Sequence, residues 1–87
     1  MEEHQVDLTP MERKVAIQIA KGKTNAEIAD HLFISQRRVG QLISSIKRKW
    51  QVHSRVLIGM MALHLGWATL AIHPRTVEVL EKKVHVR

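Results

Sequence analysis

The sequence contains no cysteine and only three aromatic residues, Phe33, Trp50 and Trp67. Without cysteine, neither a disulfide framework nor a redox compartment can be argued from the chain. With so few aromatic side chains there is no stacking platform for single-stranded nucleic acid, so a duplex is the better candidate for a nucleic-acid partner. The core must therefore be built from aliphatic residues, within a chain of 87 residues that is long enough for one domain.

Long apolar runs and targeting signals are also lacking. The most apolar segment, residues 56–72, is interrupted by Gly59, His64, Gly66 and Thr69. It falls short of the roughly 20 apolar residues that a membrane-spanning helix needs. The acidic and polar N-terminus does not resemble a signal peptide. We expect a cytoplasmic, nucleoid-associated protein with no membrane partner.

The motifs of catalysis and metal binding are missing too. There is no glycine-rich phosphate loop, no nucleophile elbow and no carboxylate pair in a fixed frame, so we expect no enzymatic activity. The histidines show no pair at helical ligand spacing and have no cysteine beside them, so we expect neither a metal nor a cofactor. The six histidines are His4, His31, His53, His64, His73 and His85.

Positive charge, by contrast, is abundant and concentrated. The formal net charge is +6 and the isoelectric point is near 10.4, which favours a polyanionic partner. Residues 36–49 hold five cations and no carboxylate. A surface helix normally mixes both signs, so this segment indicates more than a solvated face.

Residues 24–50 read as a short helix, a tight turn and a longer helix. Thr24 and Glu27 have the spacing of a capping box that begins the first helix. Ile28 and Leu32, four apart, lie on one stripe of it. Ser35 is a good N-cap for the second helix. This order predicts a helix-turn-helix arrangement.

The second of these helices is expected to bury one edge and expose the other. Val39, Ile43, Ile46 and Trp50 step by four, three and four residues and should form one narrow buried seam. A helix of this kind, with donors and positive charge on its outer side, suits the major groove of DNA. By the same periodicity the outer side carries Arg37, Gln41, Ser44 and Arg48.

Two further helices should flank this pair. A capping box at Thr9 and Glu12 predicts a helix from Pro10 to about Lys21, with Gly22 as its left-handed stop. Its core stripe is Met11, Val15 and Ile19.

Ser54 predicts the start of a last helix, from Arg55 to about Leu65. That helix is apolar nearly all round, so it needs a second burial surface. Either a dimer partner or the C-terminal tail of the same chain could supply this surface.

The tail, residues 66–87, has a mixed pattern. Residues 75–86 are compatible with a strand, because valines alternate there, or with a fifth helix, which the charges at Glu78, Glu81 and Lys82 favour. Trp67 is expected to anchor the tail on the core. We expect a flexible lead-in at residues 1–7, a DNA-binding domain at residues 8–65, and a C-terminal extension at residues 66–87 packed on the domain or at a dimer interface.

The residue types of this sequence and their spacing are similar to those of one known family. The matching residues are Leu8, Thr9, Pro10, Glu12, Ala20, Gly22, Thr24, Asn25, Glu27, Ile28, Ala29, Leu32, Phe33, Ile34, Ser35, Val39, Ile43, Ile46, Lys49, Ser54 and Arg55. Over roughly residues 8–65 the chain resembles LuxR/GerE-type helix-turn-helix transcription regulators. The resemblance implies an all-α, four-helix domain of a bacterial regulator that places its third helix in the major groove. It also implies a homodimer, formed through the last helix, on an inverted repeat. Since the chain begins seven residues before the motif, it looks like the family's stand-alone members.

The sequence departs from the family at two places. In the family, the reading helix usually begins with Thr-Val-Lys-x-His. In this chain the corresponding residues 38–42 are Arg-Val-Gly-Gln-Leu. Gly40 costs the helix about 0.5–1 kcal/mol relative to alanine and removes a side chain that the family uses on DNA. Ala16 and Gln18 stand where the family prefers large aliphatic residues. We therefore expect a thin core between the first and last helices, filled by Trp67 and the tail.

These interpretations assign roles to individual residues. Base-reading residues are expected to be Arg37, Arg38, Gln41 and Ser44. Phosphate-binding residues are expected to be Thr24, Asn25, Ser35, Gln36, Lys47 and Arg48. The dimer interface is expected to include Val56, Leu57, Met60, Met61 and His64.

Two functions remain open at this point. The first is a sequence-specific regulator of double-stranded DNA. The second is a protein-binding adaptor or antagonist of the transcription machinery, with RNA polymerase or another regulator as its partner, that keeps the same fold.

Overall fold

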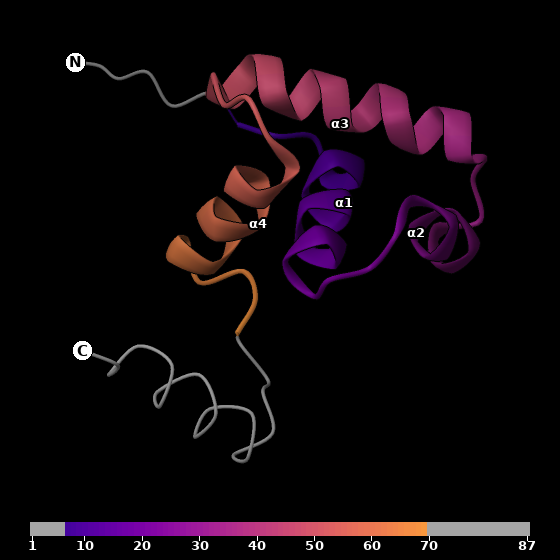
Figure 1. Ribbon diagram of the computed structural model, residues 1–87, viewed down its shortest axis with the longest axis horizontal. Helices are drawn as coiled ribbons and strands as arrows, with labels where there is room; N and C mark the ends of the chain where they lie inside the picture. Colours follow the sequence, from indigo (N-terminus) through magenta and orange to yellow (C-terminus); the bar gives the residue numbers. More distant parts are fainter. Residues whose placement is uncertain (1–6, 70–87) are drawn as a thin grey trace, which may run out of the picture.

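The computed structural model describes residues 7–69, which form a bundle of helices joined by short turns (Figure 1). The all-α, four-helix fold expected from the sequence is confirmed for this part of the chain. The strand or fifth helix expected at residues 75–86 lies outside the described residues. The helices are α1 (Pro10–Ala20), α2 (Asn25–Leu32), α3 (Gln36–Trp50) and α4 (Arg55–His64).

Each helix begins at the side-chain cap that the sequence predicted. In α1 and α2 the threonine hydroxyl accepts the N–H of the glutamate three residues later at 3.1 Å, and the glutamate carboxylate accepts the threonine N–H at 2.8 Å. These two reciprocal boxes satisfy donors that a helix start leaves free. The four capping residues are Thr9, Thr24, Ser35 and Ser54.

A residue with a left-handed backbone follows each of the four described helices, and after α4 it is Gly66, with φ +78°. Gly22 follows α1 with φ +82°, as its sequence position predicted. Phe33 after α2 and Gln51 after α3 take the same conformation, with φ of 58° and 56°. A bulky residue rarely adopts this backbone. The side chain of Phe33 is 93% exposed, so burial does not offset the strain.

The core lies where α3 crosses the other helices. In Figure 1, α3 runs along the top of the view with α1, α2 and α4 beneath it. The predicted seam is confirmed at Val39, Ile43 and Ile46, which are buried, whereas Trp50 is only half-buried. The predicted seam does not include Leu42, which is 4% exposed, so the buried edge of α3 is wider than predicted. Its width matches a helix that packs against α1, α2 and α4.

Small residues bring α1 and α4 close together. Ala16 and Ala62 are fully buried, and a Cβ added at Gly59 would lie 3.3 Å from the Cα of Ala20. The thin core expected between these helices is thus closed by the approach of the two backbones, which leaves little volume for large side chains to fill.

Trp67 is half-buried and packs against the core, as expected, but its ring contacts are with α1 and α3. Its ring centroid lies 5.7 Å from that of Trp50 on α3. The guanidinium carbon of Arg13 on α1 stands 4.3 Å from the Trp67 ring centroid, in a cation–π contact. Trp67 therefore ties residues after α4 to α1 and α3. No helix within residues 7–69 is long and apolar enough to cross a membrane.

Candidate nucleic-acid interface

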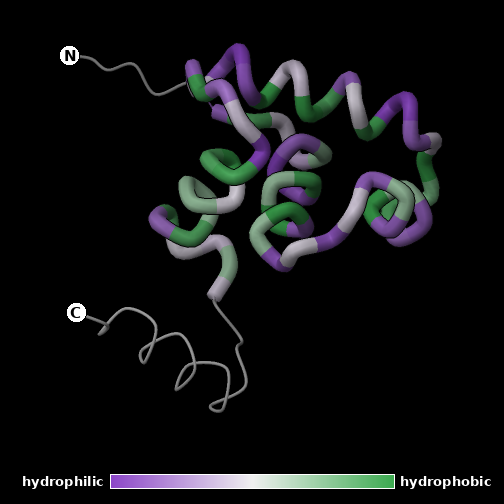
Figure 2. The backbone as a smooth tube through the Cα atoms, viewed as in Figure 1, coloured by the Kyte–Doolittle hydropathy of each residue, from purple (hydrophilic) through white to green (hydrophobic). Residues whose placement is uncertain are grey.

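The outer side of α3, defined here as Arg37, Arg38, Gln41, Ser44 and Arg48, is exposed along its whole length. Figure 2 shows the hydrophilic stretches of α3 on the side turned away from α1 and α2. All four residues expected to read bases lie on this outer side. The structure therefore brings them together on one face of one helix, where a groove of duplex DNA could receive them.

Two of these cations stand where a helix does not favour them. Arg37 and Arg38 are the second and third residues of α3, and its first turn contains no acidic residue. The N-terminal end of a helix carries the positive end of the macrodipole, which favours anions and disfavours cations. The placement costs stability in the free protein. An anion bound at this end would reverse that cost.

Two of the expected base-reading residues contact each other. Nη1 of Arg38 donates to Oε1 of Gln41 at 3.4 Å, a long and exposed hydrogen bond within α3. A bond of this length is weak, so both side chains can exchange it for base edges. Arginine pairs well with guanine and glutamine with adenine in the major groove.

The basic C-terminal end of α3 is only partly available. Lys47 is half-buried and Arg48 is exposed, with Nη2 of Arg48 3.5 Å from the hydroxyl of Ser45. Lys49 lies 2.7 Å from the carboxylate of Glu12 on α1. Of the five cations of residues 36–49, Lys49 is therefore already paired within the protein. An acid from another helix neutralises it, which the sequence of α3 alone could not show.

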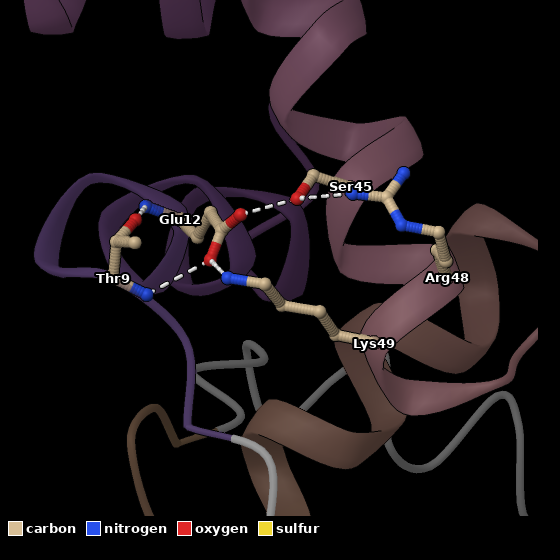
Figure 3. Close-up of polar contacts among 5 residues, drawn as sticks. All are labelled: Thr9, Glu12, Ser45, Arg48 and Lys49. Atoms are coloured by element: carbon tan, nitrogen blue, oxygen red, sulfur yellow. Dashed lines mark hydrogen bonds and ion pairs between the residues drawn. The ribbon is translucent and has the colours of Figure 1, made fainter.

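Glu12 is the centre of a polar network between α1 and α3 (Figure 3). Glu12 is 4% exposed, and its carboxylate accepts from Thr9 N at 2.8 Å, Lys49 Nζ at 2.7 Å and Ser45 Oγ at 2.5 Å. Burial raises the pKa of Glu12, but the hydrogen bonds from Lys49, Ser45 and Thr9 and the charge of Lys49 together lower it to about 2. Glu12 is thus ionised at neutral pH and fixes α3 on α1.

The start of α2 holds two of the residues expected to bind phosphate. Thr24 is exposed, and its hydroxyl oxygen accepts from Glu27 N; a hydroxyl group that accepts one hydrogen bond can also donate one. Asn25 is half-buried, and its Oδ1 accepts from Nη1 of Arg55. The sequence pattern gives Arg55 no partner, because no local pattern reports a contact 30 residues away.

The start of α3 holds two more of the residues expected to bind phosphate. Ser35 and Gln36 are both exposed, and the Ser35 hydroxyl oxygen accepts from Arg38 N at 3.0 Å. As at Thr24, the hydroxyl can accept from the cap N–H and donate its own hydrogen to an anion. Both helix starts therefore carry an exposed hydroxyl cap, and only α2 adds a carboxylate, that of Glu27.

The exposed side of α4 is apolar. Val56 is 67% exposed and Met60 57%, while Ile58, Gly59 and Ala62 face the core. Leu57 and His64 are also exposed and Met61 is half-buried, so all five residues expected at a dimer interface reach the surface. Apolar side chains of this size gathered on one exposed face are typical of an interaction surface.

Within residues 7–69 no group of three or more histidine, cysteine, aspartate or glutamate side chains is arranged to hold a metal ion.

Comparison with known proteins gives one family and several relatives. Residues 6–62 match the family model described as bacterial regulatory proteins, luxR family. Over 49 residues the chain is 49% identical to a nitrate/nitrite response regulator protein homolog of Haemophilus influenzae, covering 56% of this chain and 24% of that protein. It is 39% identical over 56 residues to the uncharacterized transcriptional regulatory protein YhcZ of Bacillus subtilis, covering 64% of this chain and 26% of that protein. It is 38% identical over 63 residues to the uncharacterized response regulatory protein YgeK of Escherichia coli, covering 72% and 43%. The chain thus spans less than half the length of each of these relatives.

Proposed function

Because the chain belongs to the luxR family of bacterial regulatory proteins, whose relatives here are named as transcriptional and response regulators, we propose that it regulates transcription as a sequence-specific homodimer. In this proposal α3 enters the major groove of double-stranded DNA and two copies bind an inverted repeat. The protein acts in the cytoplasm, on the nucleoid, without a cofactor and without catalysis.

The observation that carries the proposal is the outer side of α3. It is exposed, it contains no carboxylate, and it places Arg37 and Arg38 at the end of the helix where cations are disfavoured. On a helix that only faces solvent, nothing would offset this loss of stability. An anionic partner bound at the first turn would offset it, and the first residues of a recognition helix are those that contact base edges.

The remaining residues divide into readers and anchors. Arg37, Arg38, Gln41 and Ser44 would contact base edges, where side-chain identity sets sequence preference. The two capped helix starts would hold phosphates on either side of the groove. The eight residues of α2 span roughly 12 Å at the rise of an α-helix, similar to the width of the major groove. The phosphate-binding residues are Thr24, Asn25, Ser35, Gln36, Lys47 and Arg48.

The exposed side of α4 would form the dimer. Its centre is Met60, flanked by Val56, Leu57, Met61 and His64. A groove of about 300 Å³ beside it, lined by residues including Ala20, Gly59 and Leu63, gives a second copy a hollow to fill. Burying such a face in a two-fold interface would remove the exposed apolar surface.

A titration with duplex DNA over a series of salt concentrations tests the proposal. The wild-type protein should bind with affinity that falls steeply with salt, because cations displace condensed counterions. Replacing Lys47 or Arg48 by alanine should weaken binding to all sequences and reduce the salt slope by about one unit. Lys14→Ala, an exposed lysine of α1 outside the proposed contacts, is the matched control. Replacing Gln41 should change the ranking of sites instead, and an unchanged ranking would refute the base-reading assignment.

Dimerisation has its own test. Met60→Glu places a charge at the centre of the α4 face and should convert a dimer into a folded monomer, measured by sedimentation equilibrium and circular dichroism. Mapping of bound genomic sites should show half-sites one helical turn apart, about 34–36 Å, or a multiple of that.

A second function is favoured by the exposed apolar residues alone. The α4 face, together with the exposed ring of Phe33, could serve an adaptor that binds RNA polymerase or another regulator. The same titration separates the two, because an adaptor would show no salt-dependent binding to duplex DNA.

A further inference from the structure

Arg55 connects the start of α4 to the start of α2. Its Nη1 donates to Oδ1 of Asn25, and its Nη2 donates to the main-chain oxygen of Lys23, each at 2.5 Å. These partners lie 30 and 32 residues away in the sequence. The guanidinium group thus holds both the side chain of the first residue of α2 and the main chain just before its cap, in a forked geometry that lysine cannot reproduce.

This contact decides how the amide of Asn25 points. A guanidinium group has donors and no acceptor, so the atom facing Arg55 must be the amide oxygen. The Nδ2 group is then directed away from Arg55, and it has no hydrogen-bond partner among residues 7–69. Asn25 is the first residue of α2, so its amide belongs to a helix start whose first N–H groups, apart from the capped N–H of Glu27, have no partner within the helix. Together these donors suit an anion.

We propose that Arg55 is a positioning residue for a DNA phosphate held at the start of α2, because it fixes the amide of Asn25 with its Nδ2 donors facing that phosphate. The inference rests on the proposed DNA-binding function and adds the residue that orients one of its phosphate contacts. In this inference Arg55 acts through Asn25 and makes no phosphate contact of its own, because two of its five donors already hold Asn25 and Lys23.

A double-mutant cycle measures whether Arg55 acts through Asn25. Arg55→Ala, Asn25→Ala and the double variant are titrated with a random-sequence duplex at several salt concentrations. Each single variant should weaken binding by at least about tenfold, the size of one hydrogen bond to a charged group. The double variant should be no weaker than either single one, because the two changes remove the same contact.

The salt slope distinguishes positioning from direct charge contact. The amide of Asn25 is neutral and displaces no condensed counterion, so the salt slope of Arg55→Ala should equal that of the wild-type protein. Arg55→Lys keeps the charge and loses the fork, and it should bind as weakly as Arg55→Ala. If Arg55→Ala does not fold, which circular dichroism shows, Arg55→Lys carries the same test with the milder change.

Three results would overturn the inference. A slope reduced by about one unit with additive losses would make Arg55 a phosphate contact in its own right. Full rescue by Arg55→Lys would show that charge alone matters. Unchanged affinity with a lowered melting temperature would make the fork purely structural. A wild-type protein that binds no duplex would instead refute the proposed function, and this would be seen before any variant is compared.

Discussion

The ammonium group of Lys49 lies 2.7 Å from the carboxylate of Glu12, which joins the last turn of α3 to the first turn of α1. The same carboxylate accepts the N–H of Thr9 and the hydroxyl of Ser45. One side chain therefore caps its own helix and holds the helix proposed to enter DNA. The orientation of α3 depends on an acid that belongs to a different element.

Glu12→Gln should make the protein less stable at neutral pH. The folded-state pKa of Glu12 is about 2, below the ordinary glutamate value near 4.3. Its contribution is therefore complete above about pH 5 and is lost as the pH falls towards 2. Because the side chain of Lys49 is 26% exposed, solvent weakens the ion pair, and the expected loss is about 2 kcal/mol. Urea unfolding of both proteins from pH 7 to pH 2 measures it.

The difference between the two proteins should shrink as the pH falls, because protonated Glu12 resembles glutamine. Glu27 titrates in both proteins, since the N–H of Thr24 lowers its pKa too, so its contribution cancels in the comparison. A constant difference from pH 7 to pH 2 would mean that the ion pair is not the source of the stability.

Arg37→Gln and Arg38→Gln should strengthen the fold and weaken DNA binding. Removing each cation from the first turn of α3 relieves an unfavourable interaction with the helix dipole, worth about 0.3–1 kcal/mol. Thermal unfolding and a duplex titration should thus move in opposite directions. Arg48→Gln is the control, since Arg48 lies in the last turn, where a cation is favoured. It should weaken binding and lower stability together.

Gly40→Ala and Gly59→Val should change stability with opposite signs, although both glycines lie inside helices. A Cβ at Gly40 meets nothing within 4 Å, so alanine should stabilise α3 by about 0.5–1 kcal/mol through helix propensity. At Gly59 a Cβ would stand 3.3 Å from the main chain of Ala20. Valine there should force α1 and α4 apart and cost about 1–3 kcal/mol. Denaturant unfolding measures both, and equal effects would contradict the close packing of α1 and α4.

Phe33→Gly should raise the melting temperature. Phe33 takes a left-handed backbone with φ 58° while its ring is 93% exposed, so glycine relieves strain of about 1 kcal/mol with little loss of burial. In a domain of this size the gain corresponds to roughly 4–8 °C. Gln51→Gly, at φ 56°, is the matched control. A smaller gain at Phe33 than at Gln51 would show that the ring is held by the groove beside it, which includes Met11, Ile17 and Leu32.

Local features of the sequence were sufficient for the order and the starts of the helices. A capping box depends on residues three apart and a buried stripe on residues three or four apart, so Thr9, Thr24, Ser35 and Ser54 could be identified without coordinates. The exposed outer side of α3 followed from the same periodicity. The predicted seam lacks Leu42 because a single row of apolar residues describes a helix with one neighbour, whereas α3 packs on more than one.

By itself, then, the sequence determined four capped helices and a basic outer side on the third, because these depend on contacts within one or two turns. Only the tertiary structure decided that Glu12 neutralises Lys49, that Arg55 holds Asn25, and that α4 keeps an apolar side open after packing on α1. Those pairs lie 37 and 30 residues apart in the chain. Which side chains meet across such separations depends on how closely and at what angle helices cross, and side-chain volume at the contact sets both.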